Sequence, residues 1–501
     1  MARRPNVLII HTDEQRTDTL RLYGNPLVQT PHIDALAARG VTFDRAYVAY
    51  PQCIPSRASF MTGRYPHTTG STANSRTGHA SMQSPGLLLQ DREQQTLPAV
   101  LKAAGYRTAL AGKNHCFNAT MLAQFDFVRQ VAHWGPDAAW KPDLARRFWA
   151  FVREADLFGD AVVAWAEAPF GEDECPAGLA ADAALEFLEQ EGREEKAPFF
   201  LWLSISEPHL PFTAPAPWSR KYRPEDVTIP AWHPGELVNK PERQRVLSRM
   251  YGLHHPPDER KLRELVAMYW GLVSYADHEI GRVLTALEQR GLLDDTIVVY
   301  STDHGDFMGE HQQVHKSCAF YDCLTRTPLV ISWPAGGVLT GRRRDALVSN
   351  IDIMPTVLDL AGIPVPDAIQ GHGFAPLLRG ESYVPREAVF AEAGILAPPR
   401  TLADLDGALL PPDPFAPRTA WQQGERRPMR AWDGRAKMIR TDRWKYNHYL
   451  DNGERELYDM QADPGELTNL AGDAGYVAVE SGLRTRLLDW CITTEDTSYG
   501  R

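Results

Sequence analysis

Apolar and polar positions alternate along the chain with two different periods. Short apolar runs predict buried strands at residues 7–10, 199–204, 296–300 and 329–332. Apolar residues recur with helical spacing at residues 33–39, 96–104 and 262–289, and Arg290-Gly291 after the last segment is a typical helix end. Strands that alternate with helices predict an α/β fold in which a mainly parallel sheet lies between helices. Ligands bind at the carboxyl ends of the strands in such sheets, so we expect the chemistry just after these runs.

Two stretches interrupt this pattern, and a different pattern follows them. Residues 132–171 contain four tryptophans, and residues 394–427 are rich in proline, leucine and aspartate. After Met438, short strands at residues 444–450 and 456–458 and a helix at residues 478–490 predict a small α+β unit. We therefore expect a large domain at residues 1–385 and a C-terminal subdomain at residues 386–501, which includes the proline-rich stretch as a loop insertion.

The composition narrows the class of partner. The 501 residues are 43% hydrophobic and carry a formal net charge of −11. Nucleic acids and anionic membranes require a broad basic face, so we expect neither partner. The run at residues 7–10 is too short for a signal peptide, no run reaches about 18 apolar residues, and the six cysteines are irregularly spaced. We therefore expect a cytoplasmic protein and leave open whether it forms a homo-oligomer.

Residues 53–64 read CIPSRASFMTGR and carry the most specific signal in the chain. This segment resembles the signature of the sulfatase family, in which Cys-x-Pro-Ser-Arg directs oxidation of the cysteine to formylglycine and Thr-Gly-Arg closes the motif. Further segments resemble the family in the same order along the chain, at residues 5–13, 30–37, 105–115, 208–212, 302–305, 352–356 and 456–464. The alternative for Cys53 is a buried core thiol, the most common state of a free cysteine.

The resemblance implies an enzyme with the alkaline phosphatase-like α/β fold and a C-terminal subdomain. It implies hydrolysis of a small-molecule sulfate monoester, of an aryl or sugar alcohol, by a formylglycine that a maturation enzyme makes from Cys53. One hydroxyl of the hydrated formylglycine attacks sulfur, and the other later expels sulfate as the aldehyde forms again. Cleavage also requires cations for the developing charge and an acid for the leaving oxygen.

Two pairs of polar residues follow predicted strands. Asp13 and Glu14 follow the first strand, and Asp303 and His304 follow a later one. Together at adjacent strand ends, they predict a site for a divalent cation, with Cys53 as a further ligand. The resemblance favours Ca²⁺, with Mg²⁺ as an alternative. The family usually has Asp-Asp or Asp-Gln first and Asp-Asn or Asp-His second, and the nitrogen ligand of His304 favours Mn²⁺. The alternative is that these residues only cap helices.

The resemblance assigns five side chains to catalysis beside the nucleophile. Arg57 would hold the formylglycine hydroxyls, Lys113 would bridge sulfate and nucleophile, and His115 would accept the proton of the second hydroxyl. His209 and Lys316 would contact the sulfate and protonate the leaving oxygen.

Several nearby residues have alternative interpretations. His315 and His311 are alternatives for the acid because they lie close to the assigned lysine in the sequence. Asn74 lies shortly after the motif and is left out of the site as a loop residue. The tryptophan-rich stretch, with Trp218 or Trp232, could stack on an aryl or sugar group, although packing onto the main body is the more common role.

Two other functions stay open. A phosphonate monoester hydrolase or phosphodiesterase of the same superfamily also uses formylglycine, and Asp303-His304 suits that group, whereas Gly112-Lys113-Asn114-His115 suits a sulfatase. A non-catalytic binding protein that keeps the fold is a more distant alternative. The mass at Cys53 distinguishes a thiol from an aldehyde, and a panel of sulfate and phosphate esters distinguishes the two hydrolases.

Overall fold

The computed structural model describes residues 4–74, 95–155, 164–191, 197–230, 235–250, 258–394, 401–403, 434–450 and 453–495. A nine-stranded sheet lies at the centre, in the order β11-β2-β10-β9-β1-β7-β3-β4-β5. Its strands are β1 Asn6–Thr12, β2 Val41–Tyr47, β3 Arg107–Gly112, β4 Phe127–Ala132, β5 Gly135–Pro136, β7 Phe199–Ser204, β9 Thr296–Thr302, β10 Arg326–Ser332 and β11 Arg342–Ser349. β10 is antiparallel to β2 and β9, and β5 is antiparallel to β4, while the other neighbours are parallel.

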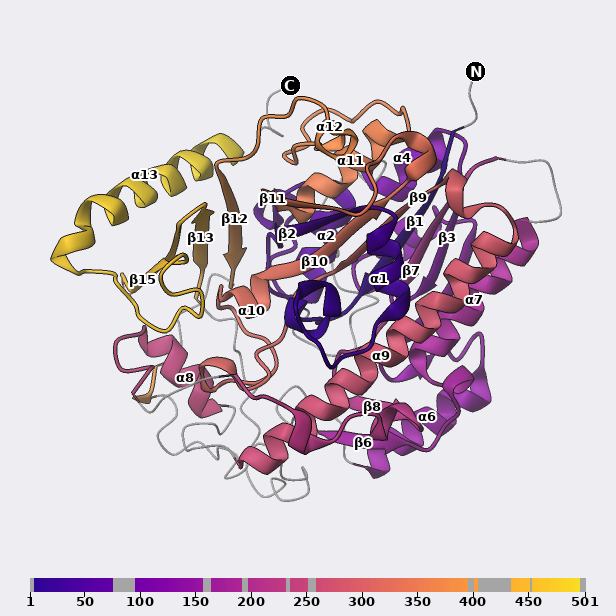
Figure 1. The fold of residues 1–501 in the computed structure, drawn as a ribbon, viewed down its shortest axis with the longest axis horizontal. Helices are drawn as coiled ribbons and strands as arrows, with labels where there is room; N and C mark the ends of the chain where they lie inside the picture. Colours follow the sequence, from indigo (N-terminus) through magenta and orange to yellow (C-terminus); the bar gives the residue numbers. More distant parts are fainter. Residues whose placement is uncertain are drawn as a thin grey trace.

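Helices cover both faces of this sheet (Figure 1). The described helices are α1 Pro31–Ala38, α2 Cys53–Thr62, α3 Pro66–Thr69, α4 Leu97–Ala103, α5 Ala119–Leu122, α6 Pro142–Glu154, α7 Pro176–Glu191, α8 Glu242–Met250, α9 Glu259–Gln289, α10 Asp322–Thr325, α11 Ile353–Leu360, α12 Ala375–Arg379 and α13 Val477–Thr494. The central strand β1 explains the two layers, because successive side chains of a strand point to opposite faces. Leu8 and Ile10 pack with α7 and α9, and Val7 and Ile9 pack with α2, α4 and α11.

A second, four-stranded antiparallel sheet lies beside edge strand β11 of the large sheet (Figure 1). Its strands are β12 Ala388–Ala393, β13 Ala436–Thr441, β14 Trp444–Tyr449 and β15 Arg455–Asp459. α13 packs on it through one apolar cluster that includes Leu487 and Trp490. Glu392 of β12 ties this sheet to α3, because its carboxylate accepts from the backbone N–H of His67 at 2.8 Å and pairs with Lys437 at 2.6 Å.

The predicted α/β architecture with a small C-terminal sheet is confirmed. The four predicted strands lie within β1, β7, β9 and β10, and the long predicted helix is α9. Helix α2 was not predicted because all of its residues are buried, so no polar stripe marks its period. Strand β11, whose first half is largely exposed and rich in arginine, was not predicted either.

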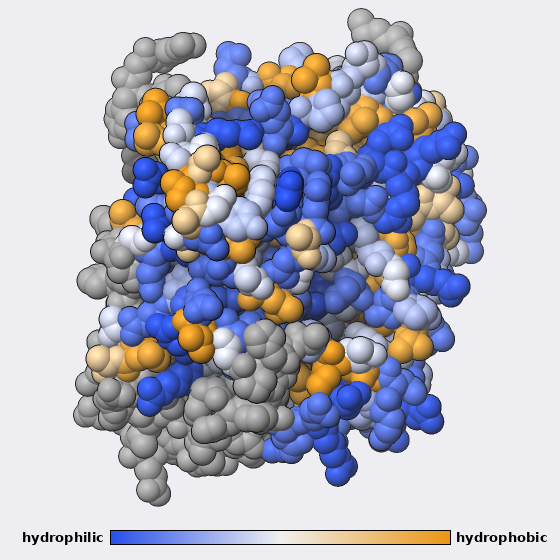
Figure 2. All heavy atoms as spheres, turned by 60° about the vertical axis from the view of Figure 1, so that its left-hand side comes forward, coloured by the Kyte–Doolittle hydropathy of each residue, from blue (hydrophilic) through white to orange (hydrophobic). Residues whose placement is uncertain are grey.

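The two predicted insertions differ in what the structure describes. Residues 132–171 contain β5, α6 and the short strand β6 Trp165–Ala168, which pairs with β8 Phe212–Pro215. The proline-rich stretch at residues 394–427 lies outside the described residues, apart from residues 394 and 401–403. No helix within the described ranges is long and apolar enough to cross a membrane. Figure 2 shows one face of the molecule, which is mostly hydrophilic with small, separate hydrophobic areas.

Candidate active site

Neighbouring parallel strands end at the same level of the large sheet. The last residues of β1 and β9 are register partners, and the last residue of β7 pairs with the last residue of β3. The residues that follow these strands therefore meet at one edge of the sheet. Asp13 follows β1, Lys113 follows β3 and Asp303 follows β9. This is the edge at which the sequence predicted the site.

The turn after β3 requires a glycine. Gly112 has a φ of +107°, and a Cβ there would lie 1.9 Å from the carbonyl oxygen of Ser204. Only glycine allows this approach and this left-handed backbone. The N–H of Lys113 donates to the same carbonyl at 2.8 Å. The turn thereby directs the Lys113 ammonium onto Oδ2 of Asp13.

Cys53 lies at the first position of α2 and is fully buried. Its Sγ is 3.2 Å from Nε2 of His304, 3.2 Å from Nζ of Lys316 and 3.5 Å from Oδ1 of Asp13. Burial, and then the Asp13 carboxylate, raise the pKa of the thiol to about 12, so it is neutral. The N-terminus of a helix favours negative charge, which suits a group at this position that becomes an oxyanion.

Four buried residues form a candidate metal centre. Asp13, Cys53, Asp303 and His304 each offer a ligand atom, and these atoms lie within 4.8 Å of one another. Nδ1 of His304 lies 2.8 Å from the carbonyl oxygen of Gly305, which leaves Nε2 directed at Cys53. A metal-binding histidine commonly bonds through its other ring nitrogen in this way.

The fifth predicted metal ligand, Glu14, faces a cationic group next to this centre. Its Oε2 lies 3.0 Å from Nζ of Lys316 and 3.4 Å from Nε2 of His209, and its Oε1 lies 2.7 Å from Nδ1 of His315. Its carboxylate also forms a separate three-residue group with Asp13 and His209 whose ligand atoms lie within 4.8 Å. Burial raises the pKa of Glu14, but His315 and Lys316 outweigh burial and hold it well below its ordinary value.

Arg57 joins the two strand ends through a fully buried guanidinium. Its Nε donates to Oδ2 of Asp303 at 2.7 Å, and its Nη2 donates to Oδ2 of Asp13 at 3.1 Å. A third bond runs from Nη1 to the hydroxyl of Ser204 at 2.7 Å. The planar fork of arginine suits such a multiple contact, which a lysine could not reproduce.

Lys316 lies between Cys53 and His209. Its Nζ is 2.8 Å from Nε2 of His209, while Nδ1 of His209 faces the carbonyl oxygen of Leu210. Burial lowers the pKa of Lys316, but the carboxylates around it, Glu14 first, raise it well above its ordinary value. Burial and then Lys316 lower the pKa of His209 well below its ordinary value. The proton of this pair is therefore held on Lys316.

The remaining predicted histidines lie in different places. His115 is half-buried, and its pKa is held well below the ordinary value by burial and then by Lys113. His315 contacts Glu14 and belongs to the cluster. His311 instead lies 2.6 Å from Oε1 of Glu236 and 3.2 Å from Nζ of Lys240, in another buried group.

Backbone strain gathers around the same residues. Glu14, His115 and His315 all have positive φ angles, of 63°, 59° and 63°. Such angles are uncommon outside glycine and are held only where the surrounding structure requires them. Three of the eight non-glycine residues with positive φ in the described part of the chain therefore lie in or beside this cluster.

Comparison with known proteins agrees with this geometry. The sulfatase family model matches residues 5–363. The chain belongs to the sulfatase family. A second family model, the C-terminal part of N-sulphoglucosamine sulphohydrolase, matches residues 431–492. This sulfatase is therefore a sulfuric ester hydrolase with the alkaline phosphatase-like fold.

Individual relatives of this sulfatase cover almost the whole chain. It is 27% identical to an arylsulfatase of Clostridium perfringens, over 94% of this chain and 91% of that protein. It is 28% identical to an N-acetylglucosamine-6-O-sulfatase of Bacteroides thetaiotaomicron, over 96% and 85%. Among solved structures, a phosphonate monoester hydrolase from Silicibacter pomeroyi superposes with a TM-score of 0.76 at 25% identity, over 99% and 96%.

Some residues that border the site of this sulfatase were not among the predicted site residues. Ser204, the last residue of a predicted strand, bonds to Arg57, and its place at the strand end was the available signal. Oδ1 of Asn74 accepts from the backbone N–H of Ile54 at 3.0 Å, one residue after the nucleophile position. His133 lies against His209 with ring centroids 4.4 Å apart, and no motif marks it.

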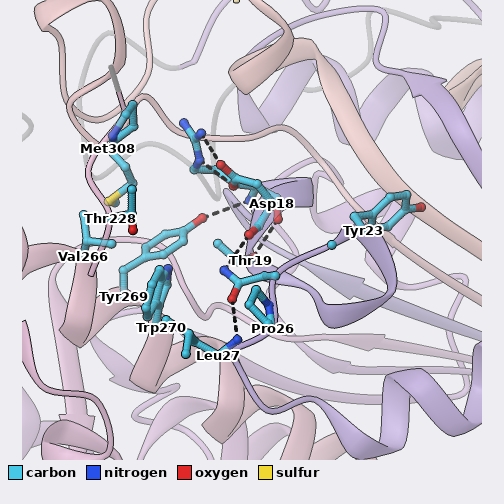
Figure 3. A pocket seen from close by; sticks show the side chains of 14 residues that line it. Asp18, Thr19, Tyr23, Pro26, Leu27, Thr228, Val266, Tyr269, Trp270 and Met308 are labelled. Carbon is cyan, nitrogen blue, oxygen red and sulfur yellow. Dashed lines mark hydrogen bonds and ion pairs between the residues drawn. The ribbon is translucent and has the colours of Figure 1, made fainter. Parts of the chain in front are cut away.

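A pocket of about 320 Å³ lies near the candidate metal centre, but its lining residues do not belong to that centre (Figure 3). Its walls include Tyr23, Trp270 and Tyr269, and the Tyr269 hydroxyl donates to the carbonyl oxygen of Glu14. The N–H of Arg16 donates to the same hydroxyl at 3.0 Å. The Tyr269 hydroxyl therefore bonds to the backbone of both Glu14 and Arg16 and stabilises the strained turn.

Proposed function

We propose that this sulfatase hydrolyses sulfate monoesters through a formylglycine at position 53 and a bound divalent cation. The observation that carries the proposal is the position of Cys53, which lies between metal-ligand candidates on one side and Lys316 on the other. When formed, the formylglycine would supply a geminal diol as the nucleophile. The maturation enzyme that forms it is part of the proposal.

The residues present fit a divalent cation. Two carboxylates, an imidazole nitrogen and the side chain at position 53 converge in a buried cluster, and oxygen-rich donors suit Ca²⁺ or Mg²⁺. The nitrogen of His304 makes Mn²⁺ a further candidate. When bound, the ion would neutralise charge on the sulfate and on the attacking oxygen.

The balance of charge suits a monoanionic ester. The three carboxylates of Asp13, Glu14 and Asp303 face the three cations of Arg57, Lys113 and Lys316, and Glu14 also pairs with His315, so a divalent ion would leave the cluster positive. His115, His209 and His304 are not counted as cations, because burial lowers the pKa of each.

The proton positions assign the acid and the base. We assign the leaving-group proton to Lys316, which holds it beside both position 53 and His209. His115 is neutral and is therefore able to accept a proton from the second hydroxyl at position 53. Lys113 would bind a terminal sulfate oxygen that is unsubstituted in a monoester and blocked in a diester.

Phosphonate monoester hydrolysis is the second candidate. It is supported by the likeness to the Silicibacter pomeroyi enzyme and by the Asp-His form of the second metal pair. Both candidates use the same nucleophile, so only substrate preference distinguishes them.

The first test is the mass of the peptide that contains position 53. Protein coexpressed with a formylglycine-generating enzyme should show a peptide about 18 Da lighter than the thiol form, since an aldehyde oxygen replaces SH and H. Cys53→Ala is the matched control and should be inactive. Full activity in protein that carries only the thiol would refute the proposed nucleophile.

The second test is a panel of aryl and sugar sulfates, phosphate monoesters, phosphodiesters and phosphonate monoesters on the modified protein. We expect the highest kcat/KM for a sulfate monoester. If a phosphonate monoester or phosphodiester exceeds every sulfate ester, the second candidate function replaces the first. The cytoplasmic location, the domain boundary at residue 386 and the oligomeric state stay predictions.

A further inference from the structure

His133 lies close to the active site without an assigned role. It follows β4 and is the first residue of the two-residue turn to β5, in which Ala132 pairs with Gly135. Two-residue hairpin turns are tight, so they fix the direction of the side chains that they carry. Gly135 also packs closely on α6, because a Cβ at this position would lie 2.9 Å from Phe148. The position of the imidazole is therefore set by rigid elements.

The ring of His133 stacks on the ring of His209. The centroids are 4.4 Å apart, and the planes differ by 20°. His209 in turn reaches Nζ of Lys316 at 2.8 Å, and Lys316 reaches Sγ of Cys53 at 3.2 Å. His209 therefore lies between His133 and Lys316, and Lys316 lies next to Cys53. The alcohol part of a bound ester would extend in this direction.

The imidazole of His133 is buried but has unused hydrogen-bonding capacity. The residue is 9% exposed, and neither Nδ1 nor Nε2 has a hydrogen-bond partner among the residues that the structure describes. Leaving a buried polar group unpaired costs about 1–3 kcal/mol, so such groups usually pair with a ligand or with ordered water. Burial, and then Lys113, lower the pKa of His133 well below its ordinary value, so the ring is neutral and offers one donor and one acceptor.

Aromatic side chains continue from His133 towards the surface. Trp134 is the second residue of the turn, and its ring stacks on that of Trp149 with centroids 6.4 Å apart. Trp149 of α6 is 38% exposed. Flat apolar rings beside a neutral donor and acceptor suit a cyclic alcohol that carries hydroxyl groups.

We propose that His133 is a substrate-binding residue that pairs with a hydroxyl group next to the sulfated carbon, so that this enzyme prefers vicinal hydroxy sulfates such as sugar sulfates. A hydroxyl both donates and accepts, and can therefore pair with either the N–H or the bare nitrogen of the neutral imidazole. The inference rests on the proposed sulfate monoesterase function and specifies its leaving group. His133 contributes binding and orientation of the alcohol, and no proton transfer is assigned to it.

The test compares two sulfates that differ by one hydroxyl. The probes are cyclohexyl sulfate and the monosulfate of trans-1,2-cyclohexanediol, with 4-nitrophenyl sulfate as the reference. In the modified wild-type enzyme, the diol monosulfate should have a kcat/KM roughly 5- to 100-fold above that of cyclohexyl sulfate, as the hydrogen-bond energies imply.

In His133→Phe, which keeps a stacked ring without polar atoms, this ratio should fall to within about threefold of the intrinsic difference in leaving-group reactivity. His133→Asn restores a donor and an acceptor and should recover part of the ratio, mainly through KM. His278→Phe is the control at a partly exposed histidine of α9, and should keep the wild-type ratio.

The outcomes separate this inference from the function on which it rests. If the wild type hydrolyses none of the three sulfates, the monoesterase function fails. If it hydrolyses them and His133→Phe keeps the wild-type ratio, the role of His133 is refuted while the function stands. If His133→Phe does not fold, as judged by circular dichroism, the ratio in His133→Asn decides. A ratio between the wild-type value and the intrinsic value supports the role of His133, and a ratio equal to the wild-type value refutes it.

Discussion

Removing the guanidinium of Arg57 should make the stability of this sulfatase depend strongly on its metal. In Arg57→Met, the carboxylates of Asp13 and Asp303 lose their shared donor while they stay buried at 0% exposure. Each charge-assisted bond contributes about 1.5–3 kcal/mol, and breaking a buried ion pair by removal of one partner costs about 3–5 kcal/mol. We therefore expect the unfolding free energy to fall by about 3–5 kcal/mol in the presence of chelator.

A divalent cation should offset much of this loss. Without the guanidinium, the two carboxylates attract the ion more strongly than the wild-type pair does, although Asp13 keeps Lys113, and an ion at about 100 times its Kd stabilises the folded state by about 2.7 kcal/mol. The assay is denaturant unfolding of wild type and variant, each with chelator and with added Ca²⁺ or Mn²⁺. The difference between the two conditions should be larger in Arg57→Met than in the wild type.

Arg64 provides the matched control. It is also fully buried and follows the same helix, but its contacts include the carbonyl oxygens of Thr62, Asp367 and Ala368 instead of the metal-site carboxylates. Arg64→Met should destabilise the protein equally with and without the ion. An equal or smaller metal-dependent difference in Arg57→Met than in the wild type would refute the reasoning, since it would mean that the guanidinium does not compete with the ion for these carboxylates.

Three further predictions follow from the same contacts. Lys113→Ala should lower kcat/KM for an aryl sulfate roughly ten- to a hundredfold, because one charge-assisted bond contributes about 1.5–3 kcal/mol, while the surface variant Lys102→Ala should leave it unchanged. Asp303→Ala should bind no ion in elemental analysis, whereas Asp277→Asn, at a buried carboxylate on α9, should keep full occupancy; full occupancy in both would exclude the proposed centre. The pKa of Glu392 is lowered to about 2 because its histidine and lysine partners outweigh burial, so its contribution of about 3 kcal/mol is present above pH 4.5 and is lost as the pH falls towards 2. Glu392→Gln should remove this part of the acid dependence of unfolding, and an unchanged acid profile would contradict the assignment.

The sequence predicted the parts of the site that follow from strand order. Asp13 and Asp303 each follow an apolar run after two intervening residues, and parallel strands bring such positions to one edge whatever their separation in the chain. The motif at Cys53 identified the third component. These signals are local, so a single sequence is sufficient to find them.

The cationic partners of Glu14 could not be predicted in this way, and its role as a metal ligand stays a prediction. Asp13 and Glu14 both follow β1, and both were expected to bind the ion. The positive φ of Glu14 turns its side chain towards Lys316 and His315. A strained backbone angle depends on surrounding contacts such as the Tyr269 hydroxyl, which lies on a distant helix, so it leaves no mark in the local pattern.

His133 shows a second reason why sequence patterns fall short. Its closeness to His209 arises because the β4–β5 turn, at one end of the sheet, places a ring over a loop that follows β7. No periodicity, motif or charge in residues 132–171 distinguishes this histidine from the tryptophans around it, and packing was the expected role of the whole stretch. What distinguishes it is the combination of burial with two unpaired nitrogens, and both properties exist only in the folded chain. The candidate ligands Asp13 and Asp303 thus follow from local patterns at strand ends, whereas the position of His133 beside His209 depends on contacts between distant segments.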